Sequence, residues 1–148
     1  MICIQKEYHF SAAHLLPNHG GQCARLHGHN YKVVVEVLGN INTLGGYSDG
    51  MVLDFHDLDD ILKSVIEPMD HRFLAKGDEW PWEVAMRGAK GGPDSPLGQE
   101  MYYVGVRTTA ELLVVYIAEK IQEELPAAIE LVFIELWETP KACARYIP

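Results

Sequence analysis

Two histidines separated by a single glycine, His27 and His29, are the residues of this chain whose types and spacing are best suited to chemistry. If a strand begins there, both imidazoles point to the same side of the sheet, because side chains alternate along a strand. Such a pair can bind one metal ion with a third ligand, and His14 at the end of "FSAAH" is the candidate. Three histidines with one open position are typical of catalytic zinc, whereas structural zinc has four protein ligands. The alternative is that these histidines only form hydrogen bonds in a polar loop.

Cys23 stands four residues before His27, and two interpretations of it are open. As a fourth ligand, it would make the zinc site structural. As a free thiol near a cation, it would have a lowered pKa and could act as a base or nucleophile. The spacing alone does not choose between them. The other cysteines, Cys3 and Cys143, lie in strand patterns and are predicted to be small core residues.

Asp70 and His71 follow a predicted helix in "DHRFL". An aspartate beside a histidine can orient a second group and tune its protonation, although neighbours in sequence need not touch each other. The alternative is a histidine that only interacts with the negative end of the helix dipole.

Two glutamates are further candidates. Glu138 ends an apolar strand on the same face as Ile134 and Leu136, so its carboxylate needs a partner there. A ligand with amidine-like N–H groups would supply that partner, and the alternative is a strand-end glutamate that faces water. Glu111 fits a capping box in "TTAE" with Thr108 as the N-cap, which is a purely structural explanation.

These residues must be positioned by strands and helices that the hydrophobic periodicity predicts. Strand patterns cover residues 2–10, 29–39, 51–55, 129–138 and 142–147. A first helix is predicted over 55–66, with Asp54 as N-cap and an end near Glu67, and a second begins at Thr108 and ends before Pro126. The pattern predicts an α+β domain, with antiparallel strands and both helices on one face. The long segment 76–106 is predicted to be functional or to contact other subunits.

Composition excludes several classes of protein. The 148 residues suffice for a single domain, and 48% hydrophobic with 22% charged residues is an ordinary globular balance. The net charge of −9 argues against nucleic acid and anionic membranes as partners. No apolar run approaches the roughly 20 residues of a membrane helix, and no signal peptide is evident. Three cysteines form no complete disulfide set, so we expect a cytoplasmic protein.

Taken together, the motifs resemble those of the 6-pyruvoyl-tetrahydropterin synthase family. The matching stretches occur in the family's order between about residues 8 and 146, and only 76–106 is unmatched. They are "FSAAH", "CARLHGHNY", "MVLDFHDL", "LDDILKSVIEPMDHRFL", "TTAELL" and "WETPKACARY". The short spacing from Cys23 to His27 and the "LDF" before the first helix look most like the 6-carboxy-tetrahydropterin synthase branch of queuosine biosynthesis. The folate-type branch keeps a glutamate near this loop, where this chain has only Gln22 and Cys23.

The resemblance implies a role for each matching residue. The implied zinc ligands are His14, His27 and His29, the implied catalytic residues are Cys23, Asp70 and His71, and the implied pterin-binding residues are Thr109, Glu111 and Glu138. In this family the catalytic relay is completed between subunits. The implied fold is the tunnelling fold (T-fold), an antiparallel sheet with two helices on one face that assembles into a barrel, as a homohexamer made of two trimers.

The implied reaction of the carboxy branch converts 7,8-dihydroneopterin triphosphate to 6-carboxy-5,6,7,8-tetrahydropterin and releases acetaldehyde and triphosphate. Two alternatives stay open: a 6-pyruvoyl-type synthase that eliminates triphosphate without breaking a carbon–carbon bond, and a non-catalytic zinc- or pterin-binding assembly. A chain of net charge −9 needs local cations for a triphosphate. Arg25 is the predicted residue, and Lys32, Arg72 and Arg107 are the other candidates.

Overall fold

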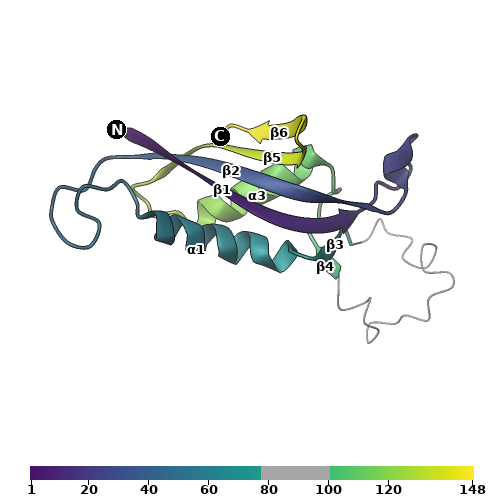
Figure 1. Cartoon of the computed structure of the whole chain (residues 1–148), viewed down its shortest axis with the longest axis horizontal. Coiled ribbons are helices and arrows are strands. Elements are labelled where there is room, and N and C mark those ends of the chain that lie inside the picture. The colour runs from purple at the N-terminus through teal and green to yellow at the C-terminus, as the bar shows by residue number, and fades with distance from the viewer. Residues whose placement is uncertain (78–100) are drawn as a thin grey trace.

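In a computed structural model that describes residues 1–77 and 101–148, the chain forms a six-stranded sheet with helices packed on one face (Figure 1). The strands are β1 Ile2–His14, β2 His27–Gly39, β3 Arg72–Ala75, β4 Met101–Tyr103, β5 Glu130–Thr139 and β6 Ala142–Tyr146. The helices are α1 Phe55–Ile66 and α3 Ala110–Glu124, and two short 3-10 turns are η1 Gln22–Ala24 and η2 Glu67–Met69. The predicted α+β class is therefore confirmed. The prediction for segment 76–106 lies largely outside the described residues.

The sheet is mixed, which corrects the prediction of purely antiparallel strands. Its order is β4-β3-β1-β2-β5-β6. The pairs β1–β2, β2–β5 and β5–β6 are antiparallel. The pairs β1–β3 and β3–β4 are parallel. The reason is the path of α1, which carries the chain back to the end of β1, where Ala12 pairs with Arg72. Neither short strand had the length or the alternation that would have predicted it.

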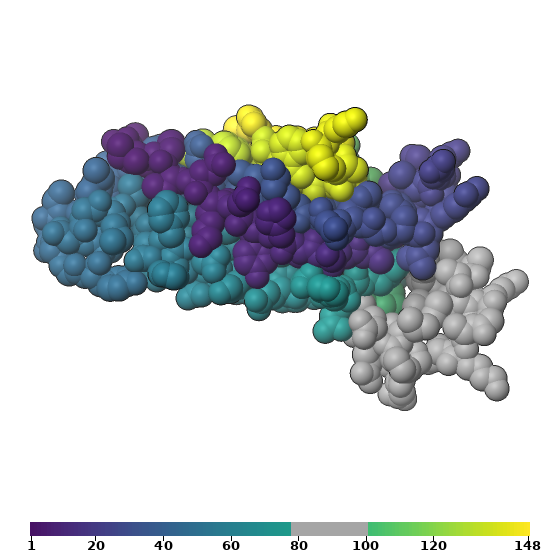
Figure 2. All heavy atoms as spheres, in the orientation of Figure 1, coloured from purple at the N-terminus to yellow at the C-terminus, as the bar shows by residue number. Residues whose placement is uncertain are grey.

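The predicted strand over 51–55 is wrong. The segment after β2 folds back on itself, because the Asn42 N–H donates to the Met51 carbonyl at 2.8 Å and the Gly50 N–H donates to the Asn42 carbonyl at 2.8 Å. These bonds form a loop instead of a ladder with β1 or β2. The loop lies at one end of the molecule and the 15–26 segment at the other, where Figure 2 shows each as a projecting lobe.

The core lies between the sheet and the two helices, as the periodicity predicts. Its fully buried members include Val33 and Val35 on β2, Leu62 on α1 and Ile117 on α3. Phe55 occupies the first turn of α1, and 53% of it is exposed.

The two cysteines predicted to be core residues are exposed instead. Cys3 and Cys143 alternate with the side chains that face the helices, so they lie on the opposite face of the sheet. Alternation identifies the two faces of a strand, but which face a partner covers depends on the tertiary structure.

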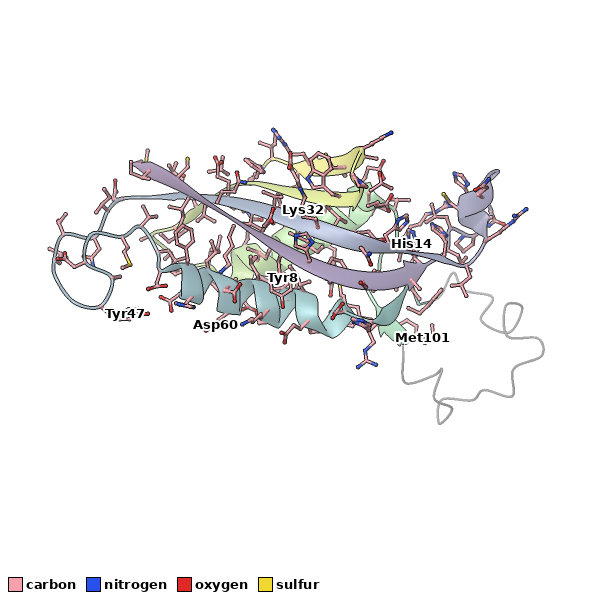
Figure 3. All side chains as sticks on the ribbon, in the orientation of Figure 1. Tyr8, His14, Lys32, Tyr47, Asp60 and Met101 are labelled. Carbon is pink, nitrogen blue, oxygen red and sulfur yellow. The ribbon has the colours of Figure 1, made fainter. Side chains whose placement is uncertain are left out.

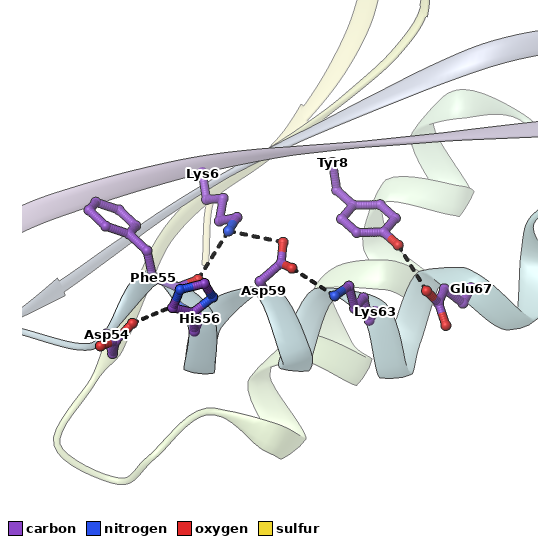
Figure 4. A network of polar contacts seen from close by, with 8 residues as sticks. All are labelled: Lys6, Tyr8, Asp54, Phe55, His56, Asp59, Lys63 and Glu67. Carbon is purple, nitrogen blue, oxygen red and sulfur yellow. Dashed lines mark hydrogen bonds and ion pairs between the residues drawn. The ribbon is translucent and has the colours of Figure 1, made fainter. Parts of the chain in front are cut away.

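Lys6 is the one polar residue in the apolar alternation of β1, and the structure explains it (Figure 4). Its ammonium donates to the Phe55 carbonyl at 3.0 Å and pairs with Asp59 at 3.0 Å. Asp59 also pairs with Lys63, and Tyr8 donates to Glu67 at 3.3 Å. These contacts join the first strand to α1 and to the η2 turn that follows it.

The helix starts differ in how well the sequence predicts them. The Asp54 carboxylate accepts from the His56 N–H at 2.7 Å, so the first predicted N-cap is confirmed. The predicted capping box is wrong: α3 has Thr109 as its N-cap, and no side chain accepts a cap hydrogen bond there. Thr108 is buried one residue earlier, where its carbonyl accepts from His14 at 2.7 Å. The start of α3 is thus tied to the end of β1.

Candidate functional site

Three histidines converge where β1 ends and β2 begins. His14 pairs with His27 in the register of the two strands, and His29 lies two residues further along β2. The Nε2 atom of His14 is 3.0 Å from that of His27 and 3.2 Å from that of His29. Ligand nitrogens about 2.1 Å from a tetrahedral zinc ion are about 3.4 Å apart, slightly more than these two separations. The sequence prediction that the three form one metal-binding group is supported by their geometry.

Backbone carbonyls hold two of these rings in the orientation that a metal requires. The Nδ1 atom of His14 lies 2.7 Å from the Thr108 carbonyl, and that of His27 lies 2.7 Å from the Arg25 carbonyl. Each Nδ1–H donates to its carbonyl, which leaves Nε2 unprotonated and directed at the shared point. Burial lowers the pKa of His14 to about 4, so the ring is neutral at neutral pH and can bind a cation. Figure 3 shows His14 near the end of the molecule that carries the 15–26 segment.

Cys23 lies in η1 and is partly buried. Its carbonyl accepts from the Leu16 N–H at 2.8 Å, which closes the loop that connects β1 to β2. Among residues 1–77 and 101–148, the group of side chains placed to hold a metal comprises the three histidines without Cys23. This geometry favours a site with an open fourth position over a closed structural site.

Asp70 and His71 touch each other and are anchored on β1. The Nδ1 atom of His71 is 2.8 Å from the Asp70 carboxylate, whose other oxygen accepts from the Ser11 N–H at 2.7 Å. The Ser11 carbonyl accepts from the His71 N–H at 2.6 Å. Burial acts to raise the pKa of Asp70, but the hydrogen bonds from Ser11 and His71 outweigh it and the pKa is lowered.

His71 combines an uncommon backbone conformation with an exposed side chain. Its φ of 56° lies in the left-handed region, which is uncommon for a residue with a side chain. Its side chain is 81% exposed, and with Nδ1 directed at Asp70 the Nε2 atom faces solvent. Sequence reasoning missed Ser11, because it acts through backbone atoms that no side-chain pattern reveals.

Glu138 is partly buried near the end of β5, where the pairing with β6 is irregular between Trp137 and Thr139. Burial raises the pKa of its carboxyl, the nearby charge of Glu111 adds to this effect, and His29 and His27 oppose it. Glu111 occupies the first turn of α3, directly after Thr109 and Ala110. Glu138 is therefore close enough to Glu111, His29 and His27 for their charges to affect its carboxyl.

Tyr31 lies beside the histidine cluster and was not singled out from the sequence. Its ring is fully buried, stacks on Phe10 with centroids 4.9 Å apart, and contacts the His29 ring edge-on at 5.3 Å. Within the described residues its hydroxyl has no hydrogen-bond partner. Alternation along β2 marks Tyr31 as buried, but gives no sign that it braces a metal ligand.

The cations proposed for a triphosphate lie in different surroundings. The Arg25 side chain is exposed, and the Lys32 ammonium lies 4.8 Å from the centroid of the Trp137 ring. Arg107 donates to the Pro17 carbonyl at 2.7 Å, and Arg72 lines an open groove of about 740 Å³. The structure does not bring these four residues into one cluster.

Comparisons with known proteins place these observations in context. The family model described as 6-pyruvoyl tetrahydropterin synthase matches residues 3–148. The 6-carboxy-5,6,7,8-tetrahydropterin synthase of Haemophilus influenzae is 38% identical over 148 residues, covering 99% of each chain. The 6-pyruvoyl tetrahydrobiopterin synthase of Pongo abelii is 31% identical over 85% of this chain and 70% of its own.

The fold has solved counterparts. The structure of 6-pyruvoyl tetrahydropterin synthase from Caenorhabditis elegans superposes with a TM-score of 0.70 and 23% identity, over 99% of this chain and 95% of that one. The predicted T-fold architecture is thereby confirmed for the single chain, with the correction of strand direction given above. No helix in the described ranges 1–77 and 101–148 is long and apolar enough to cross a membrane.

Proposed function

The chain belongs to the 6-pyruvoyl tetrahydropterin synthase family, and we propose that it is a zinc-dependent lyase of the 6-carboxy-tetrahydropterin branch. Its substrates are 7,8-dihydroneopterin triphosphate and one water molecule, and its products are 6-carboxy-5,6,7,8-tetrahydropterin, acetaldehyde and triphosphate. The observation that carries the proposal is the end-to-end similarity to the Haemophilus influenzae 6-carboxy-5,6,7,8-tetrahydropterin synthase. The histidine cluster beside Glu138 supports it, since both parts of such a site are present.

The metal would be held by His14, His27 and His29, because imidazole nitrogens are common zinc ligands. When bound, zinc supplies Lewis-acid chemistry that polarises the side-chain hydroxyls of the substrate. The carbonyls of Thr108 and Arg25 maintain the tautomer that each ligand needs.

Glu138 orients the pterin in this proposal. Its partly buried carboxylate accepts hydrogen bonds from the amino and ring N–H groups, which form an amidine-like pair of donors. Glu111 and Thr109 line the same end of α3 and complete the ring pocket. Removal of this carboxylate leaves ring donors unpaired in a partly desolvated pocket.

Cys23, Asp70 and His71 move protons at the substrate side chain in this proposal. The Asp70 carboxylate sets the His71 tautomer, so that Nε2 is the atom that exchanges a proton. Within the described residues no hydrogen bond or ion pair joins the Cys23 thiol to His71. We therefore propose that the relay forms between the Cys23 of one subunit and the Asp70–His71 pair of another, in a homohexamer.

A 6-pyruvoyl-type activity is the second candidate, and the similarity to the Pongo abelii 6-pyruvoyl tetrahydrobiopterin synthase favours it. Product analysis separates the two. Incubation of the zinc-loaded protein with 7,8-dihydroneopterin triphosphate should release acetaldehyde, measured by coupled alcohol dehydrogenase, together with a 6-carboxy product identified by mass.

The control in this experiment is His29→Ala, which should form neither product. Triphosphate release without acetaldehyde would assign the 6-pyruvoyl activity instead. Binding of zinc and pterin without any turnover would indicate the non-catalytic assembly.

A further inference from the structure

Tyr31 carries a polar group that the described part of the chain leaves without a partner. Its ring is fully buried on β2, and its hydroxyl oxygen is closed off from solvent. Within residues 1–77 and 101–148, that hydroxyl neither donates nor accepts a hydrogen bond. A buried hydroxyl that has lost its hydrogen bonds to water without replacing them destabilises the folded state. A phenylalanine would fill the same space without this cost, so packing explains the ring of Tyr31 but not its hydroxyl.

The ring of Tyr31 is held in place by its neighbours. It stacks on the ring of Phe10 with centroids 4.9 Å apart and an interplanar angle of 14°. The rings of His29 and His14 meet it edge-on, at centroid distances of 5.3 Å and 6.2 Å. These contacts leave the ring little freedom, because protein cores are close-packed. A hydrogen-bond partner must therefore move to the hydroxyl, since the ring cannot swing toward a partner.

Glu138 is the acidic side chain whose charge reaches that hydroxyl. The antiparallel register of β2 and β5 pairs Lys32 with Trp137. Tyr31 and Glu138 are the next residues of these two strands in the direction of the histidine cluster. Burial and the charge of Glu138 raise the pKa of Tyr31, so the hydroxyl keeps its proton and is a donor at neutral pH. The Glu138 carboxylate is partly buried, and within the described residues it forms no hydrogen bond or ion pair.

A bound pterin changes what this carboxylate requires. In the proposed function, the amino and ring N–H groups of the pterin bind the Glu138 carboxylate and displace water from it. A carboxylate offers about four acceptor positions, and two donors leave about half of them unfilled. Unfilled positions on a charged group are costly once water is excluded. A hydrogen bond from Tyr31 would replace the lost water and would satisfy the buried hydroxyl at the same time.

We propose that Tyr31 is a positioning residue for Glu138: when the pterin binds, the Glu138 carboxylate turns to accept a hydrogen bond from the Tyr31 hydroxyl and is thereby held in line with the ring N–H groups. The inference rests on the proposed function, in which Glu138 orients the pterin. Tyr31 itself does not touch the pterin in this arrangement, because its hydroxyl is closed off from solvent. The unpaired hydroxyl lowers the stability of the ligand-free protein and strengthens the binding of its ligand.

The test compares the zinc-loaded full-length protein with Tyr31→Phe, which removes the hydroxyl and keeps the ring. Without pterin, Tyr31→Phe should raise Tm by about 2–4 °C, because it removes a buried group that has no partner. Calorimetric titration should show an affinity for 7,8-dihydroneopterin that is weaker by about tenfold, the effect of losing a hydrogen bond to a charged group. Zinc content should not change, because the ring that contacts His29 and His14 is intact.

The matched control is Tyr116→Phe, the same chemical change at a hydroxyl that has a partner. The hydroxyl oxygens of Tyr116 and Tyr102 are 2.7 Å apart and partly buried. Tyr116→Phe should therefore lower Tm by about 2–4 °C and change the affinity for 7,8-dihydroneopterin by less than about twofold. An equal loss of pterin affinity in both variants would show a general effect of removing a hydroxyl and would overturn the proposal.

A double-mutant cycle with Glu138→Ala tests whether Tyr31 acts through Glu138. In the Glu138→Ala background, Tyr31→Phe should change pterin affinity by less than about twofold, because the carboxylate that it positions is gone. A full loss in that background, or a loss of zinc from Tyr31→Phe, would show that Tyr31 acts through another group, and the proposal would be wrong. An unchanged pterin affinity in Tyr31→Phe would also overturn it. A lower Tm of Tyr31→Phe would contradict it as well, since the hydroxyl would then have a partner without pterin.

This experiment separates the role of Tyr31 from the reaction, because the binding of 7,8-dihydroneopterin needs no turnover. Binding that depends on Tyr31 in a protein that releases no acetaldehyde would remove the proposed reaction and support the positioning role. Acetaldehyde release by a protein whose Tyr31→Phe variant binds the pterin as tightly as the parent would do the reverse.

Discussion

At the scale of single residues, the metal site depends on which nitrogen of each histidine is free. His14 and His27 both direct Nδ1 at a backbone carbonyl, and this leaves Nε2 for the metal. The carbonyls belong to Thr108 and Arg25, and neither side chain takes part in these bonds. A substitution at Arg25 can therefore change charge without removing the contact that orients His27.

The histidine cluster gives the first prediction. His29→Ala should lower zinc content by at least about tenfold under dialysis, because no fourth protein ligand compensates for the loss. Cys23→Ala should retain zinc, since the described ligand group comprises only histidines. Metal analysis of the two purified variants checks this, and a Cys23→Ala protein as poor in zinc as His29→Ala would identify a structural four-ligand site.

A second prediction concerns the division of roles between Glu138 and Cys23. Glu138→Ala should raise KM for the pterin substrate by about 10- to 100-fold, because ring donors lose their buried acceptor. Cys23→Ala should lower kcat by about 10²- to 10⁴-fold with little change in substrate affinity. Steady-state kinetics with a direct binding measurement would show an exchange of roles if the two patterns were reversed.

At the scale of elements, β1 positions more of the site than any other segment described. Its last residue is His14, its Ser11 backbone holds both Asp70 and His71, and its Ala12 pairs with the first residue of β3. The position of β1 in turn depends on α1, since Lys6 binds Asp59 and the Phe55 carbonyl.

The contact between β1 and α1 gives a pH-dependent prediction. Hydrogen bonds from Lys6 and Lys63 lower the pKa of Asp59, outweighing the effect of burial. A carboxyl with a lowered folded-state pKa stabilises the fold above its unfolded value of about 3.9, and this stabilisation is lost as the pH falls through the folded pKa. Asp59→Asn should thus lower Tm by about 1–3 °C at pH 7 and by nothing measurable near pH 2.

The control for this measurement is Asp60→Asn, which makes the same change of charge at the neighbouring exposed position. Its Tm should differ from that of the parent protein by less than about 1 °C at pH 7. An equal loss of Tm in both variants, or a loss in Asp59→Asn that persists at pH 2, would contradict the role of the ion pair.

At the scale of the whole molecule, the proposed relay joins Cys23 of one subunit to the Asp70–His71 pair of another. The predicted homohexamer would have six times the chain mass of 16.6 kDa, which native mass spectrometry measures directly. In such an assembly, one subunit supplies the thiol and a neighbour supplies the imidazole.

Mixing of inactive variants tests this arrangement. Cys23→Ala and His71→Ala homohexamers should each be nearly inactive, and hexamers reassembled from equal amounts of both should recover about a quarter of the native activity. In a random mixture, a quarter of neighbouring subunit pairs place an intact Cys23 of one subunit next to an intact His71 of the other. The absence of recovery in hexamers shown by mass to be mixed would place the relay within one chain.

Much of this protein was determined by its sequence alone. The alternation of β1, β2 and β5 and the helical period of α1 arise locally, because each element must bury one face, and they predicted the elements and the core. The spacing of His27 and His29 also predicted a shared metal, since residues two apart on a strand point the same way.

Only the tertiary structure decided the rest. The parallel strands β3 and β4 are three or four residues long, too short for a pattern, and they exist because α1 returns the chain beside β1. The N-cap of α3 is Thr109 and not the predicted Thr108, because Thr108 is buried and its carbonyl binds His14. The exposure of Cys3 and Cys143 follows from which face of the sheet the helices cover. Contacts between segments distant in the chain, such as Ser11 with Asp70, have no local signature, because their free energy depends on atoms that only the fold brings together.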